Sequence, residues 1–315
     1  MLEPIGVKRD SIVTSLGRMV YYTPSEHPWP DETTRTEEGQ SSIVFLHGFG
    51  GGSSAYEWSK VYPAFASDYR VLAPDLIGWG RSEHPERNYQ IEDYLTIIRE
   101  FLTATCSEPV TVVASSLTAA FTIRVAVEHP ELFKSLILVT PAGLSDFGED
   151  YTRSIIARVI SLPVVDNLLY WNAIATPDGV RNFLENRQFA RPERIYPEIV
   201  DAYLESAKQD NGEYAALSFV RGDLSFDLSL YLPQLTVPTA MIWGEKTQFT
   251  SVDLGKRLAA LNPSVVQELE ILEDVGLTPQ LELPAVTIGL IRRYLKLFGK
   301  TNLNNTASEI VTESL

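Results

Sequence analysis

The sequence predicts an α/β fold, in which a mostly parallel sheet carries helices on both faces and a helical cap is inserted late in the chain. Three observations predict this class. Short β-branched segments alternate with amphipathic segments up to about residue 145, the alternation stops between residues 146 and 232, and it resumes from residue 233. Alternating strands and helices are typical of a parallel sheet buried on both faces. The helical stretch between them therefore indicates an insertion after one strand.

The strands of the first part are short apolar runs followed by polar or glycine-containing loops. A β-hairpin is expected at residues 11–22, because the segment alternates and turns at Leu16-Gly17. The strands expected after it cover residues 42–46, 69–74, 110–114 and 135–140.

Helices are expected between these strands. Ile91, Tyr94, Leu95 and Ile98 recur at spacings of three and four, which is the pattern of an amphipathic helix. The helices expected in this part cover residues 56–65, 91–105 and 116–129.

Residues 146–232 contain helical patterns and no convincing strand, so we interpret them as a cap or lid. The helices expected within the cap cover residues 152–162, 167–173, 177–189 and 196–208. Later elements are strands at 239–243 and 265–272 and helices at 251–261 and 283–298. The expected division is a core formed by 1–145 and 233–300, a cap at 146–232 and a flexible tail at 301–315.

Composition and charge limit the classes of partner. The chain has 315 residues, 44% of them hydrophobic and 21% charged, which suits a globular protein with a buried core. Its net charge of −15 argues against nucleic acid or an anionic membrane surface as partner. Cys106 is the single cysteine, so no intrachain disulfide is possible, and we expect it to be a buried small apolar residue. No stretch reaches the length of a membrane span, and residues 1–10 do not resemble a secretory signal. A soluble cytoplasmic protein is therefore expected.

Ser116 lies where an expected strand runs into an expected helix. The segment Ala114-Ser115-Ser116-Leu117-Thr118 has the layout of a nucleophile elbow, G-x-S-x-G, in which a sharp strand-to-helix turn exposes a serine hydroxyl. Ala114 and Thr118 stand at the two glycine positions. Threonine is β-branched where the helix and strand backbones usually approach closely. Two outcomes are open: a looser elbow, or a threonine that fits against the alanines after it.

Five landmarks occur in the same order as in one known family. They are His47-Gly48-Phe49-Gly50-Gly51, the segment 75–82, the segment around Ser116, the segment 237–246 and the segment 272–276. On these landmarks the chain resembles the cap-bearing members of the α/β-hydrolase fold family, from about Leu16 to Leu297. The resemblance implies that the first landmark is an oxyanion loop, and that the last two precede the acid and the histidine of a Ser-His-Asp triad.

The resemblance also shows which residues are missing. It implies an aspartate where the chain has Thr247 and a histidine where it has Leu277, so the catalytic triad is degenerate. A serine hydroxyl needs a base within hydrogen-bond reach to become a nucleophile. The four histidines are His27, His47, His84 and His129, and all precede the last expected strand. By the resemblance, His47 supports the geometry of the oxyanion loop.

Other groups of the expected site remain. The backbone N–H groups of Phe49 and Leu117 are the expected oxyanion donors, and Gly48 belongs to the same loop. A carboxylate near a loop end would be a weak base unless it is strongly desolvated. The acidic residues that fall near such ends are Asp146, Glu245, Glu273 and Asp274.

An apolar pocket under the cap is the second expectation for this site. Its expected lining consists of Phe49, Trp79, Leu117, Phe249 and Leu277. For Tyr170 and Trp171 of the cap, two interpretations stay open. Either they line this pocket as well, or they pack in the interior of the cap. Small-ligand sites commonly have this apolar character with a few polar anchors.

Three functions are compatible with these residues. The first is a catalytically impaired or non-catalytic protein that binds a small apolar or amphipathic ligand, or a protein partner; the family contains hormone receptors that lost the triad histidine. The second is an ester-type hydrolase or cofactor-free lyase that uses Ser116 and the oxyanion loop with a non-standard base. The third is a structural role. The glycine-rich loop matches neither phosphate-binding motif, and we expect no cofactor and no metal.

Overall fold

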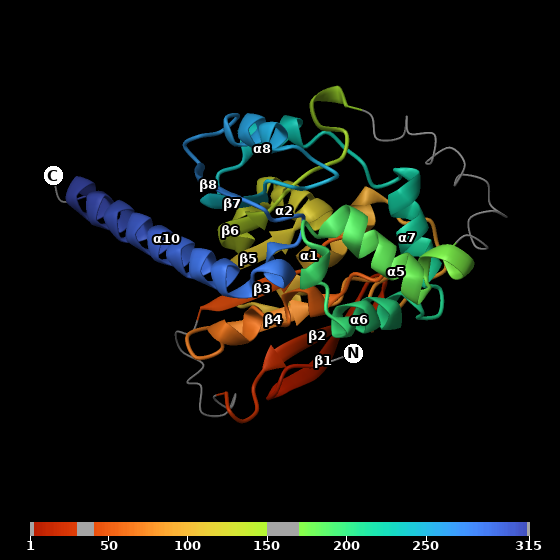
Figure 1. Cartoon of the computed structure of the whole chain (residues 1–315). Helices are drawn as coiled ribbons and strands as arrows, with labels where there is room; N and C mark the ends of the chain where they lie inside the picture. Colours follow the sequence, from red (N-terminus) through yellow and green to blue (C-terminus); the bar gives the residue numbers. More distant parts are fainter. Residues whose placement is uncertain (1–2, 30–40, 150–169, 314–315) are drawn as a thin grey trace.

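The computed structural model of the protein describes residues 3–29, 41–149 and 170–313, with side chains described as far as residue 299. The described residues form one sheet in the order β1-β2-β4-β3-β5-β6-β7-β8 (Figure 1). The strands are β1 (Val7–Thr14), β2 (Gly17–Pro24), β3 (Ser42–Leu46), β4 (Arg70–Pro74), β5 (Val110–Ser115), β6 (Phe133–Val139), β7 (Thr239–Gly244) and β8 (Val266–Leu272).

The sheet is parallel from β4 to β8. The hairpin of β1 and β2 joins it in antiparallel orientation, through the pairing of β2 with β4. Thr14 pairs with Gly17 across the hairpin turn, as expected from the Leu16-Gly17 signal. The predicted α/β class with a mostly parallel sheet is confirmed.

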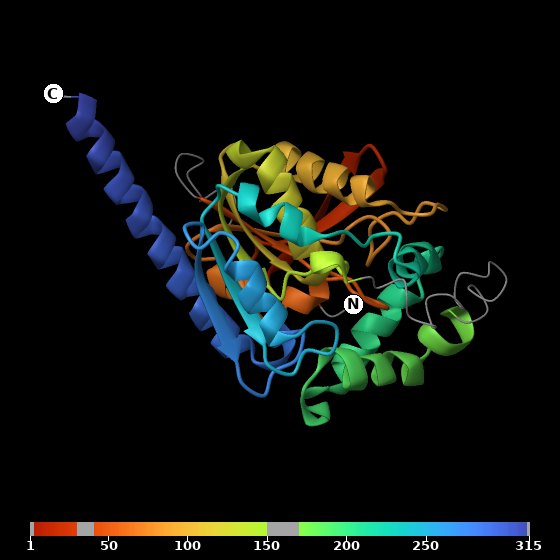
Figure 2. The same cartoon turned by 90° about the horizontal axis from the view of Figure 1, so that it is seen from above.

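Helices cover both faces of the sheet (Figure 2). Val44 and Leu46 of β3 pack on the face covered by α1 (Ile91–Thr105) and α2 (Ser116–Glu128). The alternate residues Ile43 and Phe45 pack on the other face, together with α10 (Pro284–Glu313). Helix α8 (Val252–Ala259) follows β7 and packs on the α1 side through Leu258. Because successive side chains of a strand point to opposite faces and both faces are covered, the central strands are mostly apolar.

The helix expected at 56–65 is instead a pair of short 3-10 helices, η1 (Ala55–Trp58) and η2 (Tyr62–Phe65). Pro63 stands in the first turn of η2 and has no N–H to continue a helix from η1. Further short helices connect the sheet elements. They are η3 (Pro130–Leu132), η4 (Asp146–Gly148), η9 (Leu228–Leu230), η10 (Leu232–Gln234) and α9 (Pro279–Glu282).

The described part of the chain between β6 and β7 is helical over most of its length. It contains η6 (Tyr170–Ile174), α5 (Pro177–Phe183), η7 (Leu184–Gln188), η8 (Pro192–Arg194), α6 (Pro197–Ala207) and α7 (Gly212–Arg221). Helix α7 was not among the sequence expectations, because the polar segment before Gly212 reads as a loop. The helix expected at 152–162 lies outside the described residues, as does the start of that expected at 167–173.

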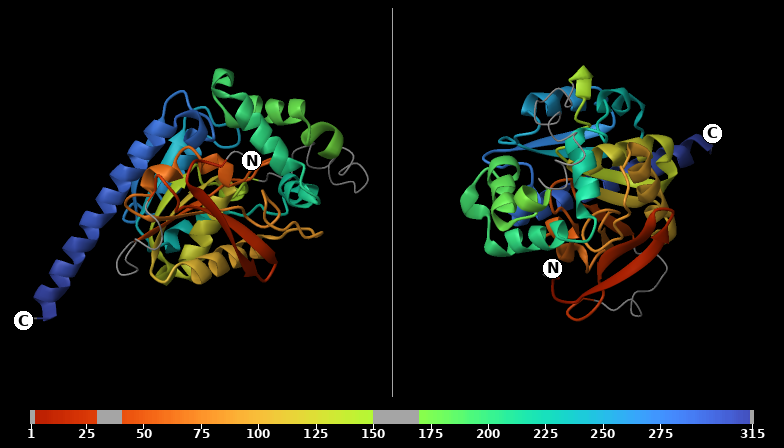
Figure 3. Two further views of the ribbon diagram at one scale, coloured as in Figure 1. Left: turned by 90° about the horizontal axis from the view of Figure 1, so that it is seen from below. Right: turned by 90° about the vertical axis from the view of Figure 1, so that its right-hand side faces the viewer.

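These helices, which we call the cap, lie over the carboxyl ends of the parallel strands (Figure 3). Ser206 of α6 contacts the loops after β3 and β4, since its Oγ donates to Ser53 O and accepts from Gly80 N, at 3.1 and 3.0 Å. The cap therefore covers the edge of the sheet where the loops expected to carry the site meet.

Helix α10 continues to Glu313, beyond the expected end at 298 and through most of the segment expected to be a flexible tail. Its last part extends away from the rest of the molecule (Figure 1). No proline follows Pro284, and Gly299, just after the expected end, weakens a helix by only about 1 kcal/mol relative to alanine. Among the described residues, no helix combines the length and the apolar character that crossing a membrane requires.

Candidate active site

Ser116 lies at a sharp turn between β5 and α2. Strand β5 ends at Ser115, and helix α2 begins at Ser116, whose φ is +56°. A non-glycine residue in this left-handed region costs about 1–3 kcal/mol and persists where the surrounding structure imposes it. Ser116 is half-buried, whereas Ser115 and Leu117 on either side are fully buried. The turn therefore presents one side chain, that of Ser116, outside the packed core.

The loop after β3 lies against this turn. A Cβ atom placed on Gly48 would lie 3.2 Å from the Ser115 Oγ and 3.3 Å from the Ser116 Cβ. A side chain at this position would be in tighter contact than usual, and its neighbours would have to shift by a few tenths of an ångström. The backbone of Gly48 and Phe49 is thus next to the serine, where oxyanion donors are expected.

His47 holds this loop in place. Its Nε2 accepts a hydrogen bond from Leu76 N at 3.0 Å, and its Nδ1 therefore carries the proton that it donates to Gly48 O at 2.7 Å. Burial lowers the pKa of His47 to about 4. Because both ring nitrogens are used and the ring is neutral, His47 connects the loops after β3 and β4 and does not offer a free base to Ser116.

Thr247 and Leu277 follow β7 and β8, at the positions expected for the acid and the histidine. The two loops run side by side, since Lys246 N donates to Val275 O at 2.8 Å. The Thr247 hydroxyl donates to the carbonyl of Thr250. Leu277 is 4% exposed, and its backbone N–H donates to Gln188 O in the cap at 2.7 Å. Neither side chain can act as a general acid or base at neutral pH.

Aromatic side chains surround Phe49. Its ring lies 5.1 Å from Trp79, 4.7 Å from Tyr94 and 6.2 Å from Phe219 of α7, measured between centroids. Phe219 in turn lies 6.4 Å from Phe249. Phe49 and Trp79 are almost fully buried, so this cluster packs the loop after β3 between the core and the cap.

The two cap aromatics have different surroundings. Tyr170 is buried, and its hydroxyl donates to Ala207 O of α6 at 2.8 Å. Trp171 is 39% exposed and packs edge-on against Tyr170. Tyr170 therefore belongs to the interior of the cap.

Glu57 is a site residue that the sequence analysis missed. It is 1% exposed; its Oε2 accepts from Gly48 N at 2.9 Å and its Oε1 from the Tyr203 hydroxyl of α6 at 3.1 Å. The hydroxyls of Ser53 and Ser115 approach the same carboxylate without completing a hydrogen bond of normal geometry. Burial raises the pKa of Glu57, and the hydrogen-bond donors around it oppose that rise. The only sequence signal is a glutamate inside the otherwise apolar run 55–58.

Three of the four acidic residues considered as alternative bases have other partners, and the fourth, Glu273, is exposed. Asp274 forms an ion pair with Arg191, and Glu245 accepts from Asp274 N at 3.2 Å. Asp146 accepts from Gly143 N and Leu228 N, at 3.0 and 2.8 Å. These carboxylates hold loops together and do not point to a base beside Ser116.

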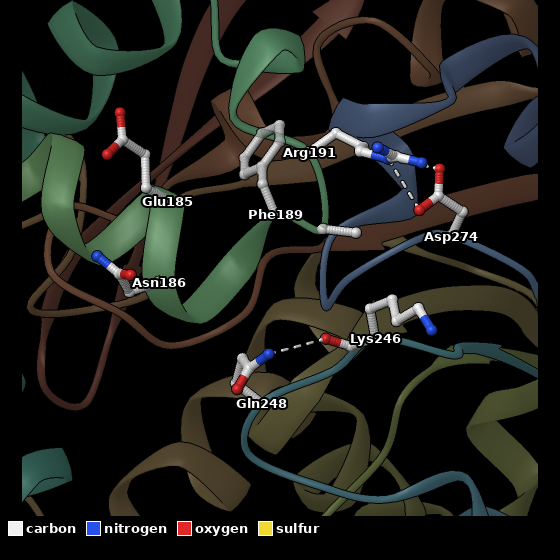
Figure 4. A pocket seen from close by; sticks show the side chains of 8 residues that line it. Glu185, Asn186, Phe189, Arg191, Lys246, Gln248 and Asp274 are labelled. Atoms are coloured by element: carbon white, nitrogen blue, oxygen red, sulfur yellow. Dashed lines mark hydrogen bonds and ion pairs between the residues drawn. The ribbon is translucent and has the colours of Figure 1, made fainter.

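Ionic contacts hold the cap segment 188–194 to the loop after β8. Arg194 pairs with the buried Glu282, which also accepts from Gly276 N and Ala190 N at 2.6 and 3.1 Å. Figure 4 shows Arg191 and Asp274 beside a polar surface groove of about 490 Å³ at this junction. The groove is lined by Glu185, Asn186, Phe189, Ala190, Arg191, Lys246, Gln248 and Asp274. The cap is therefore fixed directly above the position of Leu277.

The chain belongs to the α/β-hydrolase fold family, since the family model described as the alpha/beta hydrolase fold matches residues 42–282. The uncharacterized hydrolase YugF of Bacillus subtilis is 26% identical over 254 residues, which cover 79% of this chain and 85% of that protein. The uncharacterized protein Rv2715 of Mycobacterium tuberculosis is 32% identical over 123 residues, 39% of this chain. Those residues are 34% of Rv2715, so the match spans about a third of that relative's length.

The fold likeness extends to solved structures. The Cif epoxide hydrolase from Acinetobacter nosocomialis superposes with a TM-score of 0.75 at 18% identity, covering 93% of this chain and 90% of that one. At this level of identity the superposition shows a shared fold, and the activity has to be argued from the residues of the site.

Proposed function

We propose that this protein is a catalytically impaired α/β-hydrolase-fold protein that binds a small apolar or amphipathic ligand beside Ser116. The observation that carries the proposal is the pair Thr247 and Leu277 at the ends of β7 and β8. Removing the histidine of a serine triad lowers turnover by about 10⁴- to 10⁶-fold. What then remains is binding, through the oxyanion loop and the surfaces around it.

The histidines of the chain support this proposal. Both nitrogens of His47 are engaged in loop contacts. The Nε2 of His84 is hydrogen bonded to Gly80 O at 3.1 Å, and His129 pairs with Glu131 at the surface. None of these imidazoles has the position that a base for Ser116 requires, which is the end of β8.

The chemistry around Ser116 indicates the ligand class. Leu277 supplies an apolar surface where the family pattern has a titratable group. The backbone donors of the oxyanion loop do not depend on side-chain identity and favour a ligand oxygen. A ligand that combines an apolar body with a carbonyl group fits both features.

A residual ester-type hydrolase is the second candidate, and the strained φ of Ser116 favours it. The elbow geometry and the close approach of Gly48 are both kept, although binding alone would not require a nucleophile. A cofactor-free lyase that uses the same loop falls under this candidate as well.

One experiment separates the two candidates. The purified chain is incubated with p-nitrophenyl butyrate and with a fluorophosphonate probe, alongside Ser116→Ala. We expect no labelling of Ser116 and equal, very low hydrolysis by both proteins. Labelling of Ser116 together with turnover that Ser116→Ala abolishes would establish the hydrolase and reject the impaired site.

The expected cytoplasmic location stays a prediction, which cell fractionation checks.

A further inference from the structure

We infer that Gln188 is the residue that recognises the polar group of the ligand, by presenting the oxygen of its carboxamide as a hydrogen-bond acceptor. The inference rests on the proposed ligand site and narrows the ligand class. The ligand would carry a hydrogen-bond donor, such as an amide N–H or a hydroxyl, close to the carbonyl that the oxyanion loop receives.

The position of Gln188 supports this role. It is the last residue of η7 in the cap, and its backbone carbonyl accepts from Leu277 N at 2.7 Å. A Cβ atom placed on Gly50 would lie 3.2 Å from the Gln188 Nε2. Gln188 therefore contacts both Leu277, at the position expected for the histidine, and the proposed oxyanion loop. These are two sides of the proposed ligand site.

The orientation of the carboxamide follows from its neighbours. The Tyr203 hydroxyl donates its single proton in a hydrogen bond to the Glu57 Oε1 at 3.1 Å. The Tyr203 oxygen is then left to accept, and the neighbouring Gln188 side chain opposes the rise in the pKa of Tyr203, as a donor to that oxygen does. The amide nitrogen of Gln188 must therefore face Tyr203, because the two ends of a carboxamide are distinguished by their partners.

This orientation leaves the Gln188 Oε1 available. Gln188 is 2% exposed, and its Oε1 has no hydrogen-bond partner among the residues that the structure describes. A buried acceptor without a partner is unfavourable, and a ligand donor would relieve that cost. Hydrogen bonds link Gly48 to Glu57 and Glu57 to Tyr203, and Gln188 lies next to Tyr203. These contacts thus hold the Gln188 Oε1 in place before a ligand binds.

The test uses isothermal titration calorimetry with two series of aryl-alkyl amides of graded chain length. Primary amides offer a carbonyl and N–H donors, whereas N,N-dimethyl amides offer the carbonyl alone. We expect the wild-type protein to bind a primary amide about tenfold more tightly than the dimethyl amide of equal length. Gln188→Met keeps the side-chain length, removes the acceptor, and should bind both series equally.

Two tyrosine variants test the orientation. Tyr203→Phe removes the hydroxyl that fixes the carboxamide and should lower the preference for primary amides at least about threefold. Tyr170→Phe is the matched control, because it removes another buried cap hydroxyl, one that is bonded to Ala207 O and lies outside the chain of contacts. It should leave the preference unchanged. If Gln188→Met does not fold, Tyr203→Phe against Tyr170→Phe decides the question.

The outcomes separate this inference from the proposed function. Wild-type protein that binds both series equally, or a preference that survives in Gln188→Met, overturns the role of Gln188 and leaves the ligand site standing. Failure of every amide to bind the wild type overturns the proposed ligand site and this inference with it. Undiminished binding of the amides by Ser116→Trp, which adds bulk at the elbow, would likewise overturn the proposed ligand site.

Discussion

The backbone N–H of Leu277 donates to the backbone carbonyl of Gln188 at 2.7 Å, so the position expected for the catalytic histidine is bonded to the cap. This bond uses no side-chain atom, and it would persist with any non-proline residue at position 277. This backbone contact of the cap with the loop after β8 is therefore independent of which side chain position 277 carries.

Restoring the triad tests whether only the base and its acid are missing. Because the backbone around Leu277 and Thr247 is held by main-chain contacts, Leu277→His with Thr247→Asp should raise p-nitrophenyl butyrate hydrolysis about 10²-fold or more above wild type. Adding Ser116→Ala to this double variant should return the rate to the wild-type level. An unchanged rate in a folded double variant would mean that the cap or Thr118 also closes the site.

Glu57 should contribute to stability through its buried hydrogen bonds. Glu57→Gln keeps the shape but places amide protons where Gly48 N or Tyr203 donates, which should cost about 2 kcal/mol in the free energy of unfolding. Urea denaturation measures the change. Glu131→Gln, at an exposed glutamate paired with His129, should change the free energy by less than about 0.5 kcal/mol. Equal effects of the two substitutions would contradict the role assigned to Glu57.

Gly52 and Gly289 should respond to alanine in opposite directions. A Cβ atom on Gly52 would lie 2.1 Å from the Tyr203 backbone oxygen, and the φ of Gly52 is +96°. Gly52→Ala should therefore displace the cap and cost more than about 2 kcal/mol. Gly289 has no atom within 4 Å of the same position in α10, so Gly289→Ala should stabilise by about 0.5–1 kcal/mol. Thermal unfolding distinguishes the signs, and a stabilising Gly52→Ala would show that the cap does not rest on this glycine.

His47 should make the protein less stable in acid. Its folded pKa of about 4 lies below the ordinary value of 6.5, so the unfolded chain binds a proton first as the pH falls. The contribution is fully present above pH 6.5 and is lost as the pH falls toward 4, with about 2 kcal/mol lost between pH 7 and pH 5. His47→Gln keeps a donor for Gly48 and an acceptor for Leu76 and removes this dependence. Urea denaturation of both proteins at the two pH values should show the smaller loss in the variant.

The class of the fold was predictable from the sequence, because the signals for it are local. Alternation places Val44 and Phe45 on opposite faces of a buried strand, and spacing identifies Ile91 to Thr105 as a helix. The extent of the last helix was not predictable, since neither Gly299 nor the polar residues after it mark an end as proline would. Helix α7 was missed for a similar reason, as its start at Gly212 follows a loop-like polar segment.

The candidate site, like the fold, was predictable from the sequence only in part. The order of motifs along the chain was enough to identify Ser116, Thr247 and Leu277 as the positions to examine. The tertiary structure alone decided that both nitrogens of His47 are engaged, and that Glu57 lies beneath Gly48. It also decided that Tyr203 reaches this glutamate from a segment more than a hundred residues away. Sequence periodicity reports the burial of a residue, whereas hydrogen bonds between distant segments depend on how the cap docks on the sheet.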